Sequence, residues 1–362
     1  MSALALPARA EEAWRWADLS GLPALAEARP SGRTPPASDW LLEGAGPRLV
    51  FVDGVLDAAA SRPAGLAIGP VSAVSGHALG QLTRGATGWT LTLAADAAPA
   101  GPIEIVHLGS GGASHVPAEI RLADGAQASL VESFAGHGWA NRFTAIRLGQ
   151  GARLMRAVRI AQADGFVSLR DEAQLGAGAS LVTVALGAGG GDLRFDAEVT
   201  LGAPEAFAEV GGALLTRGRQ RQEAAVVLRH AAAAGQSRQT WRAVAADQAV
   251  ASLAARVEVA RDAQQTDGEQ SLRGLLLDRT ATINLKPELE IFADDVKCAH
   301  GATVGELDAQ ALFYCQSRGI PRARARGLLT RAFVADALDR IGEAAVREAF
   351  RADAEAWLEA AL

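Results

Sequence analysis

Apolar and polar residues alternate with a two-residue period through much of the stretch from residue 101 to residue 210. This period is typical of β-strands that bury one face. Five alternating segments open on a glycine, and these glycines lie at positions 101, 125, 151, 178 and 202. A repeat of about 25 residues in a β-rich chain predicts a solenoid with one coil per repeat. The alternative is a β-sandwich, in which turns recur at shorter intervals.

The two ends of the chain have different patterns. Residues 2–29 are rich in Ala, Leu, Glu and Trp and predict a helical segment, followed by a Pro- and Gly-rich linker over 30–47. Beyond Gly305 the apolar residues adopt helical spacing, which predicts helices over 308–315, 325–338 and 343–358. We therefore expect three parts: an N-terminal helical region and linker (1–47), a β core (48–305) and a C-terminal helical domain (306–362).

Short strands are predicted on both sides of the 101–210 region. The segment R-L-V-F-V-D-G-V-L (48–56) indicates two strands around an Asp53-Gly54 turn. Between 222 and 290 the alternation continues with more charged residues, and N-L-K-P-E-L-E-I-F-A (284–293) predicts a strand. The expected fold class is thus mainly β.

Composition narrows the classes of function. The chain has 362 residues and a net charge of -6, which argues against a nucleic-acid binder and against a polybasic membrane anchor. The acidic N-terminal segment does not resemble a signal peptide, and no apolar run is long enough to span a membrane. Two cysteines are too few for a disulfide framework. We expect a reduced, cytoplasmic protein that binds neither nucleic acid nor membrane.

Familiar enzymatic motifs are missing from the sequence. The glycine-rich run at 187–191 lacks the lysine of a phosphate-binding loop and predicts a plain loop, so we expect no nucleotide site. No G-x-S-x-G nucleophile motif occurs. A solenoid carbohydrate-active enzyme would need carboxylates and aromatic platforms along one groove, and residues 101–210 contain few aromatics. We therefore expect a protein that is not an enzyme.

The most distinctive chemistry lies in A-D-D-V-K-C-A-H (293–300). On a strand, Asp294, Val296, Cys298 and His300 share one face. Thiolate and imidazole are ligands of iron and zinc, and the neighbouring Lys297 could lower the pKa of the thiol. Two ligands make only half a metal site, so the remainder must come from elsewhere in the fold or from another chain. The alternative is a buried strand in which the cysteine acts as a small apolar residue.

The remaining candidates are more readily explained by packing. Cys315 lies among apolar residues of a predicted helix, where we expect it in a core. The same expectation of a packing role applies to four tryptophans: Trp14, Trp16, Trp241 and Trp357. The scattered histidines are expected at the surface or in satisfied core positions; they are His77, His107, His115, His137 and His230.

Three segments resemble the SufB/SufD family of iron–sulfur cluster assembly proteins. The longest is L-K-P-E-L-E-I-F-A-D-D-V-K-C-A-H-G-A-T-V-G-E-L-D-A-Q-A-L-F-Y-C-Q-S-R-G-I (285–320), supported by A-Q-Q-T-D-G-E-Q-S-L-R-G-L-L-L (263–277) and E-E-A-W-R-W-A-D-L (11–19). H-G-A-T-V-G-E (300–306) is similar to SufD, because SufB typically has H-E-A-T-T-S-K there. F-Y-C-Q (313–316) departs from this pattern and is more SufB-like.

The resemblance implies a right-handed parallel β-helix flanked by helical regions. It implies a non-catalytic scaffold subunit that pairs through its β-helix with a SufB-like homologue. It also implies a SufC-like ABC-type ATPase bound to the C-terminal helical domain. Cys298 and His300 match the family's Cys-x-His, so they would hold transient iron or an iron–sulfur cluster shared with the partner chain. The isolated chain could form a homodimer, and a purely structural adaptor without a metal role is the alternative function.

Overall fold

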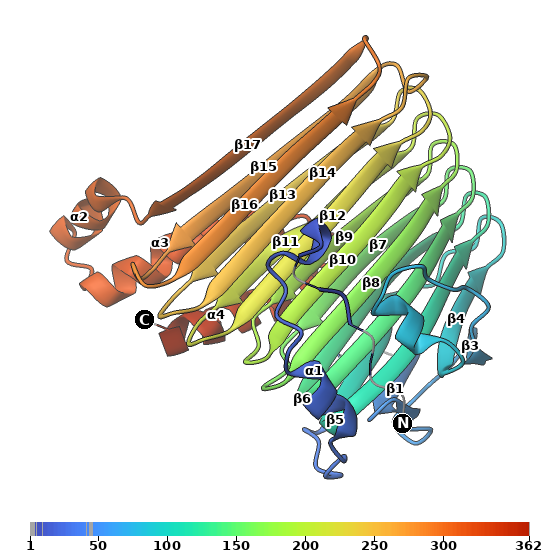
Figure 1. Cartoon of the computed structure of the whole chain (residues 1–362), viewed down its shortest axis with the longest axis horizontal. Coiled ribbons are helices and arrows are strands. Elements are labelled where there is room, and N and C mark those ends of the chain that lie inside the picture. Colours follow the sequence, from blue (N-terminus) through green and yellow to red (C-terminus); the bar gives the residue numbers. More distant parts are fainter. Residues whose placement is uncertain (1–3, 5, 9, 41, 43–45, 362) are drawn as a thin grey trace.

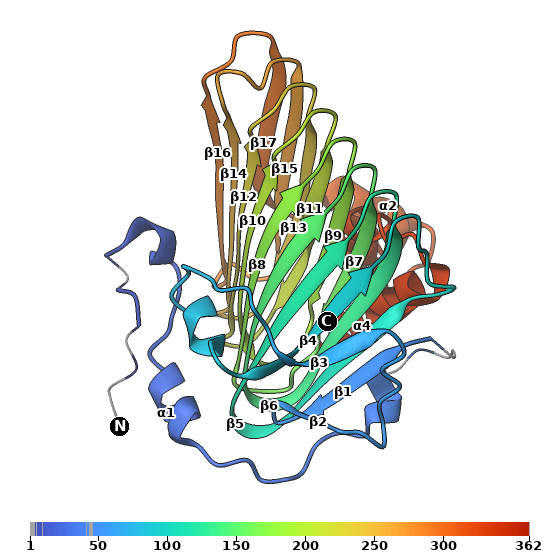
Figure 2. The ribbon, with the colours of Figure 1, turned by 90° about the vertical axis from the view of Figure 1, so that its right-hand side faces the viewer.

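The computed structural model describes residues 4, 6–8, 10–40, 42 and 46–361, and these form a parallel β-solenoid flanked by helices (Figure 1). The coils contribute strands to two sheets that face each other (Figure 2). The first sheet contains β1 (Arg48–Val52), parts of β5 (Ile103–Leu122) and β6 (Gln127–Leu148), β7 (Arg153–Ile160), β9 (Ser180–Gly187), β11 (Phe207–Thr216), β13 (Gln236–Ala245), β15 (Thr266–Leu276) and β17 (Val296–Glu306). The mainly β prediction and the choice of a solenoid over a sandwich are confirmed.

The second sheet runs opposite the first along the whole solenoid. It contains β3 (Leu66–Pro70), β4 (Thr87–Leu93), the later parts of β5 and β6, β8 (Phe166–Leu175), β10 (Asp192–Leu201), β12 (Arg221–His230), β14 (Val250–Val259) and β16 (Thr282–Ile291). The predicted turn at Asp53-Gly54 joins β1 to the short antiparallel β2 (Val55–Leu56). Both turn residues have positive φ, 49° and 81°, as the tightest hairpins require.

The coils become longer toward the C-terminal end. Among the early coils, Asp192 pairs with Phe166; among the late coils, Thr282 pairs with Val250. The two paired residues are further apart in the sequence in the late coils than in the early ones. A period of about 25 residues, taken as one repeat per coil, therefore describes the early coils and underestimates the late ones. Added residues widen each coil, so the last coil is the broadest part of the solenoid (Figure 2).

A left-handed backbone position recurs at one corner of the coils. Gly125, Gly151 and Gly178 occupy it with φ of 69°, 63° and 61°. The next coil uses Glu205 there, with φ of 60°, and its amide donates to the carbonyl of Ala233 on the following coil. Gly202, which opens the fifth segment of the sequence pattern, therefore lies before the corner and not at it. Non-glycine residues continue this corner in later coils, which is why the glycine period fades from the sequence.

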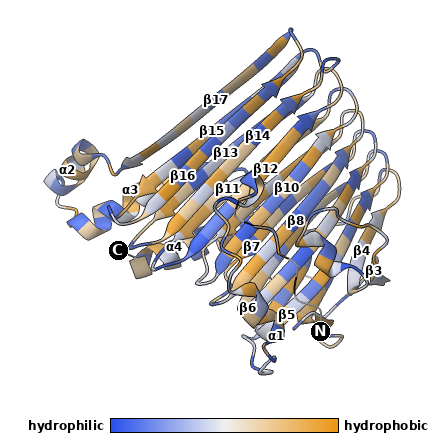
Figure 3. Ribbon diagram, viewed as in Figure 1, coloured by the Kyte–Doolittle hydropathy of each residue, from blue (hydrophilic) through white to orange (hydrophobic). Residues whose placement is uncertain are grey.

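The interior between the sheets is apolar over most of its length, and apolar and polar residues alternate along the strands (Figure 3). One buried ionic cluster interrupts it. Arg142 contacts Glu132 (3.1 Å) and Asp171 (2.7 Å), and Arg156 contacts Asp171 (2.7 Å) and Glu132 (3.4 Å). His107, stacked between two phenylalanine rings, lies 3.0 Å from Glu132. All five side chains are buried, so two guanidinium groups and two carboxylates neutralise each other inside the coil.

The N-terminal region is only slightly helical, so the prediction of one helical segment over 2–29 is wrong for its described residues. It contains a single turn, η1 (Glu12–Trp14), and a short helix, α1 (Leu22–Glu27); further turns are η2 (Ala37–Trp40) and η3 (Gly80–Thr83). The segment lies instead along the outer face of the second sheet (Figure 2). Its apolar side chains are buried against the solenoid, and they are Trp14, Ala17, Leu19 and Leu22. These tertiary contacts hold the segment in an irregular path that local helical propensity could not predict.

Three C-terminal helices match the predicted ones: α2 (Ala309–Ser317), α3 (Arg322–Leu338) and α4 (Ala344–Ala361). α3 and α4 cover the outer face of the first sheet, where Phe350, Trp357 and Leu358 pack against residues such as Leu215 and Val244. Among the described residues, none of the helices is long and apolar enough to cross a membrane.

Candidate functional site

The last coil of the solenoid has no coil stacked on it. β16 pairs only with β14, and β17 only with β15, within the described part of the chain. Its inward-facing apolar side chains therefore remain partly exposed, and they include Ile283, Leu285, Leu289, Val296 and Val304. We call this surface, formed by the inner sides of β16 and β17, the end face. An exposed apolar surface bounded by two unpaired strands is the form of surface that takes another β-structure.

Pro287 interrupts the unpaired edge of β16. The amides of Thr282 and Phe292 donate to β14, at Ala249 and Val259. Because alternate amides of a strand point to opposite sides, Pro287 lies among the residues whose backbone faces the free edge. A proline has no amide hydrogen, so the free edge lacks one donor at its centre. Pro287 therefore does not remove a hydrogen bond between β16 and β14.

Cys298 and His300 belong to the end face. Cys298 is half-buried and packs against the interior cluster, as does Val296. His300 is exposed and follows Cys298 by two residues on β17, so both side chains point to the same side of the strand. The shared face predicted for Val296, Cys298 and His300 agrees with the register of β17. Asp294 lies in the bend before the strand, so the prediction does not extend to it.

Polar side chains lie behind these two residues in the interior. In the strand register, Ser237, Gly268 and Cys298 form one row, and Gln239, Gln270 and His300 form the next. Gly268 has no side chain and leaves a gap between Cys298 and Ser237. A Cβ at position 268 would fill this gap, at 3.4 Å from the sulfur of Cys298 and 3.5 Å from the hydroxyl of Ser237.

The two glutamines leave hydrogen-bonding capacity unused. Gln239 and Gln270 donate their side-chain amides to the carbonyls of Arg256 and Glu288, at 3.0 and 3.3 Å. Their buried Oε1 atoms have no partner among the described residues. Unmet polar groups are costly in an interior, and these two belong to the row of side chains that ends at His300.

Burial raises the pKa of the Cys298 thiol, and the carboxylate of Asp267 adds to the rise, while the backbone amide of Gly268 opposes it. The expectation that Lys297 lowers this pKa is wrong, because Lys297 lies on the opposite side of β17, away from the interior. The thiol is therefore protonated in the isolated chain at neutral pH. A bound cation would favour the thiolate, since metal binding releases the proton.

A complete metal site is absent from the described part of the chain, since no group of three or more His, Cys, Asp and Glu side chains comes together there. Cys298 and His300 can supply at most one thiolate and one imidazole. Tetrahedral iron and zinc sites need four ligands. The end face thus offers two donors, fewer than such a site needs.

The other sequence candidates are distributed over the fold. Trp14, Trp241 and Trp357 are buried, as predicted, and Trp16 is half-buried. Cys315 is not in a core: it is half-exposed on α2, which has no buried residue. α2 projects from the body (Figure 1), and its two aromatic side chains, Phe313 and Tyr314, are largely exposed.

A charged cluster under the N-terminal segment was not anticipated from the sequence. Arg194 pairs with Asp196 (2.8 Å) and Glu223 (2.6 Å) and lies 4.3 Å from the ring centre of Trp14. The ring of His77 lies tilted against that of Trp14, with 5.0 Å between the ring centres, and its Nε2 is 3.3 Å from Asp196. The strand register places Arg194 beside Glu223, but only the fold brings the segment around residue 14 onto them.

The carboxyl of Glu223 gives a prediction for stability. Burial raises its pKa from 4.5 to about 7, against the opposing effect of Arg194. The folded state therefore binds this proton more tightly, so this group's contribution to stability falls as pH rises from about 4.5 to 7. Glu223→Gln should remove that loss, on the order of 2–3 kcal/mol. Urea unfolding at pH 5 and pH 8 checks it; an equal pH dependence in both proteins would contradict the expectation.

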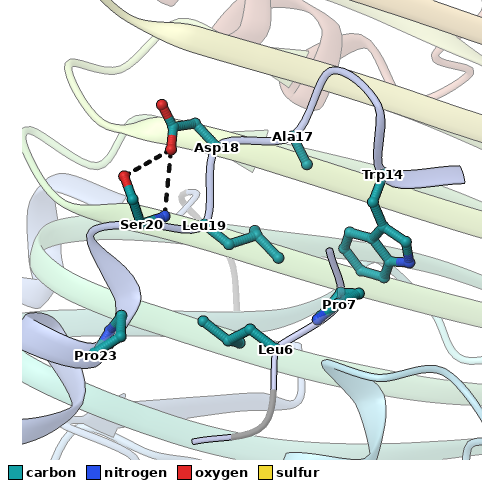
Figure 4. Close-up of a pocket in the computed structure, with 8 residues that line it drawn as sticks. All are labelled: Leu6, Pro7, Trp14, Ala17, Asp18, Leu19, Ser20 and Pro23. Carbon is teal, nitrogen blue, oxygen red and sulfur yellow. Dashed lines mark hydrogen bonds between the residues drawn. The ribbon is translucent and has the colours of Figure 1, made fainter. Parts of the chain in front are cut away.

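A hollow of about 430 Å³ lies within the N-terminal segment itself (Figure 4). Leu6, Pro7, Leu19 and Trp14 line it. Its one carboxylate, Asp18, accepts hydrogen bonds from the hydroxyl and amide of Ser20. Such an apolar lining offers no chemistry comparable to that of Cys298 and His300.

Comparisons with known proteins agree with this geometry. A family model described as "SUF system FeS cluster assembly, SufBD core domain" matches residues 107–333. The chain belongs to this SufB/SufD family. It is 28% identical to the iron–sulfur cluster assembly protein SufD of Escherichia coli (strain K12) over 262 residues, which cover 69% of this chain and 62% of that protein.

Two other relatives extend the comparison. A SufBD family protein of Mycobacterium tuberculosis (strain H37Rv) is 29% identical over 71% of this chain and 67% of its own length. A SufBD family protein of Synechocystis is 41% identical over 32% of this chain and 26% of its own length. The matched region thus spans less than two thirds of the Escherichia coli relative. The resemblance stated from the sequence is confirmed, including its likeness to SufD.

Proposed function

We propose that this chain is a scaffold subunit in iron–sulfur cluster assembly, and that Cys298 and His300 hold transient iron or a cluster together with a partner chain. Iron is here a cargo and not a resident cofactor. The observation that supports the proposal most is the position of both donors on the one coil that has no coil stacked on it within the described residues. A second β-helix placed there would bring its own donors to them.

The proposed partner at the end face is a SufB-like homologue. Two exposed strands and a partly exposed apolar interior favour β-sheet continuation between chains. Val304 and Ile291 face the interior and are still 43% and 37% exposed, which is more than apolar residues of an interior normally show. Stacking a further coil on β16 and β17 would cover them. A homodimer of the isolated chain would use the same surface.

The proposed partner at the C-terminal helices is a SufC-like ABC-type ATPase. Phe313 and Tyr314 on α2 are 72% and 60% exposed, the largest exposures among the prominent apolar side chains of the described helices. Arg318 lies over Tyr314, and the arginines at 322 and 324 follow at the start of α3. An aromatic pair beside a basic cluster suits a protein partner with an apolar pocket and acidic rim. No nucleotide motif occurs in this chain, so ATP hydrolysis would be the partner's reaction.

The purely structural adaptor remains the alternative, and one observation bears on it. A structural strand edge has no use for the unmet acceptors of Gln239 and Gln270 beside His300. They are consistent with an end of the solenoid that meets polar groups or solvent. A carbohydrate-active enzyme would need free carboxylates beside aromatic platforms. One hollow does bring carboxylates beside Trp14 and Trp16, but those carboxylates are held in ion pairs with Arg194 and Lys286.

The test is an anaerobic affinity purification of this chain from its native cell extract, with the bound proteins identified by mass. We expect an ABC-type ATPase and a longer homologous β-helix protein. The α2 variant Phe313→Ala/Tyr314→Ala should lose the ATPase and keep the homologue. Recovery of the chain alone would contradict the proposal, since it would remove the source of the missing ligands.

A further inference from the structure

The outer margin of the last coil is acidic. Five carboxylates lie along it, against two ammonium groups, for a net charge of -3; they are Glu12, Glu288, Glu290, Asp294 and Asp295, with Lys286 and Lys297. We call these seven residues the acidic rim. Glu290, Asp294 and Asp295 are exposed, and none of them forms an ion pair with a described residue at the distances found elsewhere in the fold.

Lys286 does not offset this charge toward an approaching chain. Its ammonium nitrogen lies 2.5 Å from an oxygen of Glu12 and 3.2 Å from an oxygen of Glu288, so two carboxylates already surround it. The pKa of Lys286 is raised by these partners, and that of Glu12 is lowered by Lys286. Glu12 is brought there by the N-terminal segment, which Trp14 and the carbonyl of Ala13 fix to Arg194. The chain thus delivers a distant carboxylate to its own free edge.

An inner coil contains an ion pair of a kind that Glu290 in the acidic rim does not form. Arg229 on β12 lies between Glu198 of β10 and Glu258 of β14, at 2.8 and 2.7 Å. The next residue in that row is Glu290, which is directly opposite Glu258. Like charges directly opposite each other on neighbouring strands are destabilising. Arg256 of β14 reaches Glu258 at 3.7 Å and Glu288 at 3.2 Å but forms no ion pair with Glu290, so a cation on the strand beyond β16 would relieve the contact at Glu290.

We propose that the strand which adds to β16 carries basic side chains on its outer side, opposite Glu290, and that the acidic rim disfavours pairing between two copies of this chain. This inference rests on the proposed function, because it assumes that the end face is an interface. The occupant is a β-strand edge of a different protein with a basic margin. Two copies of this chain would bring two acidic rims toward each other. A partner with a basic margin would instead be attracted over a longer range, and the opposite charges would fix its orientation.

The test uses this chain as its own partner. In the double variant Glu290→Lys/Asp294→Lys the rim becomes net positive, and the lysine introduced at position 290 would face Glu258. Both original side chains are exposed, so the fold should persist. The matched control is Glu27→Lys/Glu359→Lys, which makes the same change in net charge at exposed positions away from the end face. Analytical ultracentrifugation then measures association of each protein alone and of each mixture with the wild type.

The mixture of wild type and rim variant should associate about tenfold more tightly than wild type alone at about 50 mM salt, and this advantage should shrink at about 500 mM. The control mixture should behave as wild type alone. Equal association of wild type with itself and with the rim variant would overturn the inference, as would the same gain in the control or no association in any mixture. None of these outcomes decides the proposed function, which is tested separately by the capture of a homologous β-helix protein from the native extract and by the iron content of the complex.

Discussion

Arg142→Met should lower the free energy of unfolding by about 3–5 kcal/mol. The guanidinium of Arg142 is 1% exposed and contacts both Glu132 and Asp171. Removing it leaves two buried carboxylates with one remaining cation, Arg156. Arg142 holds the pKa of both carboxyls below their ordinary values against the opposing effect of burial. The methionine fills a similar volume, so the loss would come from the uncompensated charge and not from a cavity.

Arg147→Met is the matched control, because Arg147 lies on the same strand and its side chain is 60% exposed in its ion pair with Glu119. It should cost less than about 1 kcal/mol. Urea unfolding followed by tryptophan fluorescence measures both variants. The stability deficit of the Arg142 variant relative to wild type should shrink as the pH falls toward the ordinary pKa values of the two carboxyls, because the remaining cation holds their pKa values down less strongly and the folded variant takes up protons more readily. Similar stabilities of the two variants would show that the buried cluster does not hold the coil together.

Val304→Arg should weaken binding of the homologous β-helix partner at least about a hundredfold. Val304 faces the interior from β17, where its methyl group and one of Ile283 both lie within 3.2 Å of the Cβ position of Gly274. Its side chain is still 43% exposed, so the folded monomer can place an arginine there with its charge in water. In the complex that charge would be buried against an apolar surface without a partner.

Thr303→Arg is the control for this variant, since Thr303 precedes Val304 and points to the outer side of the same strand. It should bind the partner almost as wild type does. Affinity of the purified partner for each variant, measured by calorimetry, separates the two cases. Equal weakening by both substitutions would show that the interior side of β17 is not the surface that the partner covers.

Much of the fold could be predicted because its cause is local. The two-residue alternation follows from strand geometry, and the glycines at 125, 151 and 178 mark a corner that needs positive φ. The C-terminal helices followed from their apolar spacing. The later corners could not be found this way, because Glu205 and its successors take the same conformation with ordinary side chains.

Long-range contacts explain the remaining differences. The segment around Trp14 was predicted as a helix from its composition, but the fold uses its apolar residues to cover the second sheet. The pairing of Glu12 with Lys286 joins two residues 274 positions apart, and no local pattern indicates it. For the site, the spacing of Cys298 and His300 predicted a shared face on a strand. That this strand would be the last one, with its inner side open, depends on the stacking of the whole solenoid.

The central claim is that Cys298 and His300 complete an iron or iron–sulfur site with a partner chain. The most direct measurement is the iron and acid-labile sulfide content of the anaerobically purified complex, compared between wild type, His300→Ala and Lys297→Ala. Lys297 is the control, because it lies on the same strand and points to the opposite side. The account predicts that His300→Ala keeps the partners and loses most of the iron, while Lys297→Ala retains it. An unchanged iron content in an intact His300→Ala complex would contradict the account and leave this chain as a structural adaptor.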